Sequence, residues 1–388
     1  MRSESIRILE LGEIIKTVTP PKKIQTSEFL EVGDYPIVDQ SPLNVAGWTN
    51  DASALVHPPK DGLIVFGDHT CVLKYESNSF AQGADGIKII EVMDNLNPHY
   101  VYAHLKAFPL INDGYKRHFS DLKRLKIHIP EAKIQDYISE VHRIIDSKIA
   151  LNIALSKTLE DIAQTIFKSW FINFDPVKAK MVGGKPTGMD ASTAALFPNS
   201  LEHSEIGLIP KGWNVRSIGE SVIKQKVGKL FDSKTSSPSG SVPVLDQGKS
   251  GVVGFHNDEP GVFASPDAPL VVFANHTCSL RLVSYPFSVI QNVFPLMGNK
   301  VDVMWLYFAV EGKQQFDSYK GHWPDFVLHK IIQPTELATY AFRKRVEPLL
   351  KQKWLLEQQS KILGNLRDAL LPRLILGELS ILEELLPL

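Results

Sequence analysis

The chain has 388 residues, 44% of them hydrophobic and 22% charged, which is ordinary for a globular protein with two or three domains. No apolar run approaches the roughly 18 residues that a membrane span needs, and the N-terminus lacks a signal-peptide core, so we expect a cytoplasmic protein rather than a membrane or secreted one. The formal net charge of −1 means that an anionic partner would have to bind at local basic patches.

The first 130 residues predict a compact, mostly β domain with one or two small helices. Short apolar segments alternate with turns, a pattern typical of antiparallel sheets. Strands are expected at 35–40, 62–74, 86–92 and 125–129, and a helix is expected at 97–108.

Residues 130–171 predict one long helix, because no Pro or Gly follows Pro130. At about 1.5 Å per residue, some forty residues would extend roughly 60 Å. Apolar residues recur at heptad spacing, which is typical of a helix that packs along a second helix. This ladder consists of Ile138, Ile145, Asn152, Leu159 and Ile166, with Ile134, Val141, Leu155 and Ile162 expected to complete its apolar stripe.

The composition changes after this helix. Residues 173–212 are rich in Gly and Pro, which predicts a linker that crosses the surface.

The second half of the chain then repeats the first. Pro36–Gln40 matches Pro243–Gln247, and His69–Cys71 matches His276–Cys278, both at an offset of 207 residues. A second ladder lies 204 residues after the first and consists of Phe342, Leu349, Leu356, Leu363 and Leu370. Offsets held across so many identities indicate two copies of one unit.

We therefore predict an α+β protein with a pseudo-two-fold internal repeat, in which two β-rich globular domains are separated by two long antiparallel helices that form a coiled coil. The predicted parts are a globular domain, a helix, a linker, a second globular domain, and a second helix with its tail, at residues 1–130, 131–172, 173–212, 213–333 and 334–388. Pro348 is expected to start or kink the second helix, and Pro372 to end it. Asn152 interrupts the first ladder, either as a buried residue that fixes the helix register or as a solvated gap.

The chain carries no recognisable catalytic motif. The tripeptide Gly248–Ser250 ends like a phosphate-binding loop, but Pro243 replaces the required Gly. The stretch Asn97–Tyr100 resembles a motif of amino-methyltransferases, but no Gly-rich cofactor loop precedes it, and a helix start is the better interpretation. Each His-x-Cys pair offers two metal-type side chains where structural zinc takes four, so we expect no metal site and favour packing on a buried strand. The two cysteines, Cys71 and Cys278, lack C-x-x-C spacing and favour a reducing compartment.

Duplicated loops are the best candidate binding surface. Lys and Arg can neutralise phosphates, while Gln, Tyr and Arg can reach base edges, so a nucleic-acid interface is one hypothesis and an ordinary solvated loop is the other. The candidate DNA contacts are Lys22, Lys23, Gln40, Ser41, Tyr115, Lys116 and Arg117 in the first copy, and Lys224, Lys226, Lys229, Gln247, Tyr319, Lys320 and His322 in the second.

The order of these parts resembles the specificity (S) subunit of type I restriction–modification systems. The resemblance covers essentially the whole chain and includes two short stretches between the modules, Asp175–Val177 and Ile209–Trp213. It implies that the globular domains are target recognition domains, each reading one half of a bipartite double-stranded DNA sequence in the major groove. One departure is that the first module lacks the Pro-Lys-Gly-Trp stretch that precedes the second.

The same resemblance implies the partners. The helices would set the spacing between the half-sites and dock two methyltransferase (M) subunits, and restriction (R) subunits would join the full complex. Such a chain would have no active site and no cofactor, because S-adenosylmethionine, ATP and Mg would bind to partner subunits. Two alternatives are a single-chain restriction or methylation enzyme with fused recognition domains, and a protein-binding scaffold that does not bind DNA.

Overall fold

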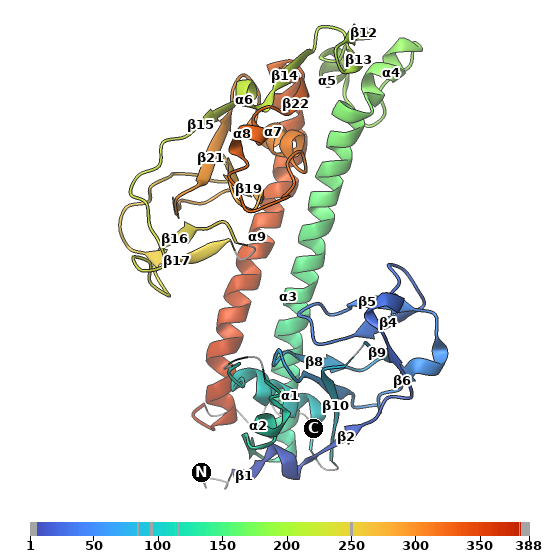
Figure 1. The fold of residues 1–388 in the computed structure, drawn as a ribbon, viewed down its shortest axis with the longest axis vertical. Coiled ribbons are helices and arrows are strands. Elements are labelled where there is room, and N and C mark those ends of the chain that lie inside the picture. Colours follow the sequence, from blue (N-terminus) through green and yellow to red (C-terminus); the bar gives the residue numbers. More distant parts are fainter. Residues whose placement is uncertain are drawn as a thin grey trace. The chain divides into compact units, whose positions relative to one another are not determined.

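The computed structural model describes residues 6–83, 85–93, 96–112, 114, 116–248, 251–379 and 381. The chain divides into two compact units: unit 1 is Met1–Asn152 with Gln359–Leu388, and unit 2 is Ile153–Gln358. Two long helices, α3 (Ala132–Phe167) and α9 (Glu336–Ile375), each contribute one end to each unit (Figure 1). No helix in the described ranges is long and apolar enough to cross a lipid bilayer.

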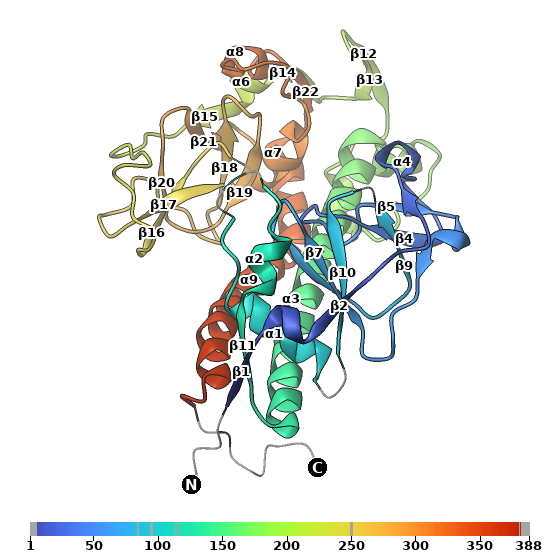
Figure 2. The same cartoon turned by 60° about the horizontal axis from the view of Figure 1, so that its bottom comes forward.

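Unit 1 contains two small sheets. The first is antiparallel in the order β2-β10-β7-β8, and its central strands lie side by side in Figure 2. Strand β7 is buried along its whole length, which explains its continuous apolar run. The bounds in the first sheet are β2 Ile15–Val18, β7 Leu63–Gly67, β8 Leu73–Glu76 and β10 Ile87–Val92. The second sheet contains β3 Lys23–Ile24, β4 Tyr35–Val38, β5 Gly47–Thr49, β6 Leu55–Val56 and β9 Phe80–Gly83.

A strand pair and two helices complete unit 1. Strand β1 (Arg7–Glu10) pairs with β11 (Lys126–Ile129), directly before α3 begins. Helix α1 (Pro98–Ala107) covers the first sheet, and α2 (Phe119–Lys123) is a short turn of helix. Leu11, Tyr100, Ile138 and other residues of these elements form one apolar core with the C-terminal end of α9.

Unit 2 repeats this architecture. Its four-stranded sheet has the order β15-β21-β18-β19, and β14 pairs with β22 as β1 pairs with β11. The bounds are β14 Asn214–Ser217, β15 Val222–Lys224, β18 Leu270–Ala274, β19 Leu280–Val283, β21 Val293–Gly298 and β22 Lys330–Gln333. A second sheet contains β16 Val242–Leu245, β17 Val252–His256 and β20 Ser288–Val289, and the helices are α6 Ile218–Ser221, α7 Val303–Val310 and α8 Trp323–Phe326. The matching strand orders agree with the internal repeat expected from the sequence.

The two long helices pair antiparallel within each unit. In unit 1 the Asp146 carboxylate bonds the Arg367 guanidinium at 2.6 Å, and in unit 2 the Lys353 ammonium lies 3.0 Å from the Glu160 carboxylate. Of the ten predicted seam residues, Ile138, Ile145, Asn152, Phe342 and Leu356 are buried, and Leu159, Ile166, Leu349, Leu363 and Leu370 are half-buried. The antiparallel helix pair is thus confirmed.

Two of the four intermediate positions in the predicted stripe are wrong, whereas Ile134 and Val141 are half-buried. Leu155 and Ile162 are exposed, and the buried positions between the ladder residues are instead Ser139, His142, Ser156 and Ala163. Each helical residue turns by about 100°, so Leu155 and Ile162 project roughly 60–100° away from the line of Ile145 and Asn152. Three of the four buried residues are small, which lets the helices approach closely.

The segment after α3 is not a surface linker. A π-helical turn (Lys168–Ile172) follows α3, and then come α4 (Asp175–Met181), α5 (Ala191–Ala195) and the hairpin of β12 (Leu201–Ser204) and β13 (Gly207–Pro210). Phe174, Phe197 and Trp213 are buried and join the aromatic core of unit 2. Apolar burial of these anchors outweighs the loop-like composition between them.

Pro348 does not start the second long helix, and Pro372 does not end it. Helix α9 begins twelve residues before Pro348 and continues through it, because Val346 and Leu350 pack in the core on either side and offset the lost hydrogen bond. The helix also passes Pro372 and ends at Ile375, two residues before Gly377, whose φ of +71° suits a helix C-terminus.

Candidate nucleic-acid interface

A tight turn follows β7 in unit 1. The Cys71 amide donates to the Gly67 carbonyl at 2.8 Å, and the Thr70 hydroxyl donates to the Gln40 carbonyl at 2.8 Å. Cys71 has a φ of +56°, a left-handed conformation that is unusual for a residue other than glycine. The prediction that His69 and Cys71 lie on one face of a buried strand is therefore wrong, because the strand ends at Gly67 and the turn is partly exposed.

The same turn follows β18 in unit 2, with the same contacts. The Cys278 amide donates to the Ala274 carbonyl at 2.9 Å, the Thr277 hydroxyl donates to the Gln247 carbonyl at 2.7 Å, and Cys278 has a φ of +57°. In addition, the Gln247 side-chain oxygen accepts from the His276 amide at 2.7 Å. Two copies of a strained backbone conformation with the same partners indicate that the turn serves a purpose beyond closing a hairpin.

Each turn forms hydrogen bonds with a basic loop that contains predicted DNA contacts, and in unit 1 this is the loop with Lys116 and Arg117. In unit 1 the His69 Nδ1 donates to the Lys116 carbonyl at 3.0 Å, and the His118 amide donates to the Asp68 carbonyl at 2.8 Å. The His118 ring is buried, and its Nε2 lies 3.1 Å from the Gly114 carbonyl. Gln40, Lys116 and Arg117 are thus brought to one place, while Tyr115 lies outside the described residues.

The loop of unit 2 is held in the same way. The His276 Nδ1 donates to the Lys320 carbonyl at 2.8 Å, and the His322 amide donates to the Asn275 carbonyl at 2.9 Å. His322 is fully buried, so it anchors the loop and does not present its side chain to a ligand as the sequence suggested. The two turn histidines, His69 and His276, were not among the predicted contacts, although their identity at one offset could have indicated a shared role.

Most of the predicted lysines make ion pairs at the surface. Such exposed pairs are weak, so a phosphate group can replace the carboxylate at little cost. The Asp51 carboxylate accepts a hydrogen bond that raises the pKa of Lys22, and the Asp325 carboxylate likewise raises the pKa of Lys320. The pairs are Lys22–Asp51 at 2.7 Å, Lys23–Asp85 at 2.6 Å, Lys116–Asp121 at 3.2 Å, Lys229–Asp258 at 3.0 Å, and Lys320 with Asp317 at 3.2 Å and Asp325 at 3.1 Å.

The remaining predicted contact residues differ in how accessible their side chains are to a ligand. Arg117 and Lys226 are exposed, and neither forms an ion pair with another described residue. The Lys224 ammonium lies 3.5 Å from the centre of the Phe294 ring, and burial lowers its pKa. Ser41 is turned inward, because its hydroxyl donates to the Asp39 carboxylate at 2.6 Å. Arg117 and Lys226 are therefore the most accessible cations of the set.

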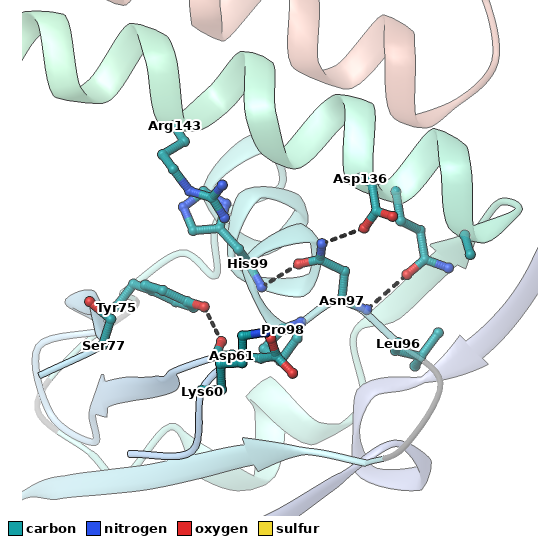
Figure 3. A pocket seen from close by; sticks show the side chains of 12 residues that line it. Lys60, Asp61, Tyr75, Ser77, Leu96, Asn97, Pro98, His99, Asp136 and Arg143 are labelled. Atoms are coloured by element: carbon teal, nitrogen blue, oxygen red, sulfur yellow. Dashed lines mark hydrogen bonds between the residues drawn. The ribbon is translucent and has the colours of Figure 1, made fainter. Parts of the chain in front are cut away.

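A pocket of about 630 Å³ in unit 1 lies beside the start of α1 (Figure 3). Asn97 caps that helix: its side-chain oxygen accepts from the His99 and Tyr100 amides at 2.9 and 3.1 Å, and its amide donates to Asp136 at 2.7 Å. The stretch that resembles a methyltransferase motif is thus a helix start, as predicted. Among the described residues, no group of three or more His, Cys, Asp or Glu side chains could hold a metal ion.

The equivalent helix start in unit 2 is built from different residues. There Asp302 caps α7 by accepting from the Met304 amide at 2.8 Å, and Lys351 holds the Asp267 loop against α9 at 2.6 Å. The residues at this helix start thus differ between the two copies, whereas the turns and basic loops share their hydrogen bonds. The duplicated turns and loops are the better candidates.

Comparison with known proteins relates the chain to specificity subunits of type I restriction enzymes. Residues 2–161 match the model of the type I restriction modification DNA specificity domain. The chain is 24% identical over 335 residues to the type I restriction enzyme HindI specificity subunit of Haemophilus influenzae, covering 67% of this chain and 70% of that protein. It is 23% identical over 294 residues to the MjaIX specificity subunit of Methanocaldococcus jannaschii, covering 68% of this chain and 63% of that protein, slightly less than two thirds of its length.

The fold also has a solved counterpart. The crystal structure of a type I restriction–modification system S subunit from M. genitalium aligns with a TM-score of 0.57 over 96% of this chain and 98% of that one, at 14% identity. This likeness confirms the predicted fold, with its two sheet-rich domains and long helices. Residues 2–161 therefore resemble a type I restriction modification DNA specificity domain, and about two thirds of the chain is similar to specificity subunits of type I restriction enzymes.

Proposed function

We propose that the chain is the DNA-recognition subunit of a type I restriction–modification complex and that each unit reads one half of a bipartite target. The observation that carries this proposal is the duplicated turn, which fixes a basic loop by the same hydrogen bonds in both units. A rigid loop with exposed Arg, Lys and Tyr side chains suits the major groove, where base edges differ in donors, acceptors and methyl groups.

The long helices would separate the readers and dock the partner subunits. Helices of 36 and 40 residues extend about 54 and 60 Å, compared with about 34 Å for one turn of DNA. Besides the face buried in the pair, each helix carries a second apolar stripe that solvent reaches. It contains Ile144, Leu151, Leu155 and Ile162 on α3, and Leu355, Ile362 and Leu366 on α9.

The repeat supports two equivalent docking sites on these stripes. Leu151 and Leu355 occupy matching positions and are each 59% exposed, and Ile162 and Leu366 match at 43% and 45%. Apolar side chains at helical spacing are what a partner helix packs against. We assign the stripes to two methyltransferase subunits, one for each copy of the unit, with restriction subunits completing the complex.

The chain itself would position the DNA and would catalyse no reaction. Adenine methylation requires the base to leave the helix stack and enter a pocket of the methyltransferase. In this proposal, S-adenosylmethionine, ATP and Mg²⁺ bind to the partner subunits, and the described residues of this chain only hold the DNA in register.

The test is a domain exchange. The full chain is produced with the methyltransferase subunit of its system, methylated genomic sites are mapped, and residues 1–130 are replaced by the same module of a relative. One half of the methylated sequence should change and the other should stay. A change in both halves, or in neither, would refute the two-reader proposal.

Two controls separate this proposal from its alternatives. DNA retention should weaken steeply as salt rises, because phosphate contacts release counterions, and a protein-binding scaffold would show no such retention. Methylation or cleavage by the purified chain alone would favour a single-chain enzyme instead.

A further inference from the structure

Tyr319 of unit 2 is an exposed aromatic residue on a rigid support. Its ring is 86% exposed and stacks on the His276 ring, with centroids 5.2 Å apart and planes at 12°. One face of the phenol ring therefore lies on the imidazole, and the rest of the ring is open to solvent.

His276 has no polar edge left for a ligand. Its Nδ1 donates to the Lys320 carbonyl at 2.8 Å, which assigns the proton to that nitrogen, and its Nε2 accepts from the Asn292 side-chain amide at 3.2 Å. The ring orientation is fixed from both sides by these bonds. His276 is thus a positioning residue, and Tyr319 is the group that can touch a ligand.

The loop that carries Tyr319 is also fixed. The His322 Nε2 lies 3.0 Å from the Ser318 carbonyl, and the Lys320 ammonium is held by two carboxylates, those of Asp317 and Asp325. The Trp323 amide donates to the Asn275 side chain at 2.7 Å. Tyr319 is thus presented on a loop that is tied down on both sides, so little conformational entropy is lost when it binds.

We infer that the Tyr319 ring recognises the 5-methyl group of a thymine in the half-site that unit 2 reads. This inference rests on the proposed function. An intact duplex presents base edges and not base faces in the major groove, and the thymine methyl is the apolar group among those edges. An open aromatic ring beside a basic loop matches such a methyl group, while the lysine ammonium groups match the flanking phosphates.

The experiment combines variants of the protein with variants of the DNA. The full chain with its methyltransferase subunit binds duplexes of the mapped target, in which each thymine of the second half-site is replaced in turn by deoxyuridine, at one fixed salt concentration. For wild type, one replacement should weaken binding about fourfold, the value of one buried methyl group. Tyr319→Ala should bind the thymine and deoxyuridine duplexes equally, while Tyr319→Phe should keep the fourfold difference.

Three further measurements sharpen the result. His276→Ala should reduce the fourfold difference without changing the salt dependence of binding, because it releases the ring and removes no charge. Tyr340→Ala, at another exposed tyrosine of unit 2, should keep the difference. A second half-site without thymine, or equal deoxyuridine effects in wild type and Tyr319→Ala, would overturn the inference while specific DNA binding remained. Loss of all sequence preference in the wild-type complex would refute the proposed function as well.

Discussion

Substitution of Asn152 tests whether a buried polar residue stabilises or destabilises the pair of long helices. Its side chain is 1% exposed, and its Nδ2 donates to the Gln359 Oε1 at 2.9 Å within unit 1. The solvated-gap interpretation is therefore excluded, and a buried polar residue with a partner on the opposite helix remains. We consider the substitution Asn152→Leu, because the equivalent residue in the second copy is Leu356.

The expected effect follows from how the polar atoms are satisfied. The Asn152 Oδ1 is buried and has no hydrogen-bond partner, which costs about 1–3 kcal/mol. Asn152→Leu removes that atom and buries more apolar surface, and Gln359 is exposed, so water can replace its lost bond. We expect Asn152→Leu to raise the free energy of unfolding by about 1–2 kcal/mol.

Urea denaturation of Asn152→Leu, Gln359→Leu and the double variant measures this effect. Gln359→Leu alone should be destabilising, because it leaves both polar ends of Asn152 unsatisfied, and the double variant should recover most of the loss. The midpoint should change while the slope with urea stays constant. If Asn152→Leu lowers stability by more than about 1 kcal/mol, the polar pair is a net stabiliser and the reasoning fails.

Three other predictions concern pH, docking and DNA affinity. Burial lowers the pKa of His99 and His104 to about 4 from 6.5, so both side chains are neutral at pH 7. The stability that depends on neutral rings is complete above pH 6.5 and is lost as pH falls toward 4, by at most about 3 kcal/mol for each histidine, and urea midpoints at pH 7 and pH 5 measure this loss. Leu151→Asp or Leu355→Asp should each weaken binding of one methyltransferase subunit at least tenfold in titration calorimetry without unfolding the chain, whereas undiminished binding of both subunits would contradict the docking proposal. Arg117→Ala should weaken DNA binding and reduce the slope of log affinity against log salt by about 1, and an unchanged slope would place this guanidinium away from phosphate.

The helices and the repeat were predictable because their signals are local. An unbroken run of helix-forming residues predicts α3, and the triplet His69–Cys71 at a fixed offset from its copy reveals the duplication. The face of α3 that is buried was harder to predict, since Ile145 and Leu155 belong to two apolar stripes with the same spacing. Heptad counting does not distinguish them, and the choice depends on how closely the helices approach at Ser156.

The packing of residues 173–212 and the shape of the turns could not be predicted from composition. Phe174, Phe197 and Trp213 are far apart among Gly and Pro residues, and only the folded core shows that they meet. Similarly, a left-handed conformation is expected at glycine, and Cys71 gives no such signal. The hydrogen bonds of its neighbours impose this conformation, and they come from segments distant in the sequence.

The paired turns have one backbone frame, which in the proposed function would serve two different recognition sites. The atoms that build the frame are the same in both units: the threonine hydroxyl, the histidine Nδ1 and the buried loop histidine. The residues that project from it differ, because Arg117 in unit 1 corresponds to Gly321 in unit 2, where an added Cβ would lie 3.0 Å from the Asn275 amide nitrogen. The frame thus keeps the same hydrogen bonds while the residue at this position differs between the units, which would let each unit read its own half of the DNA target that we propose.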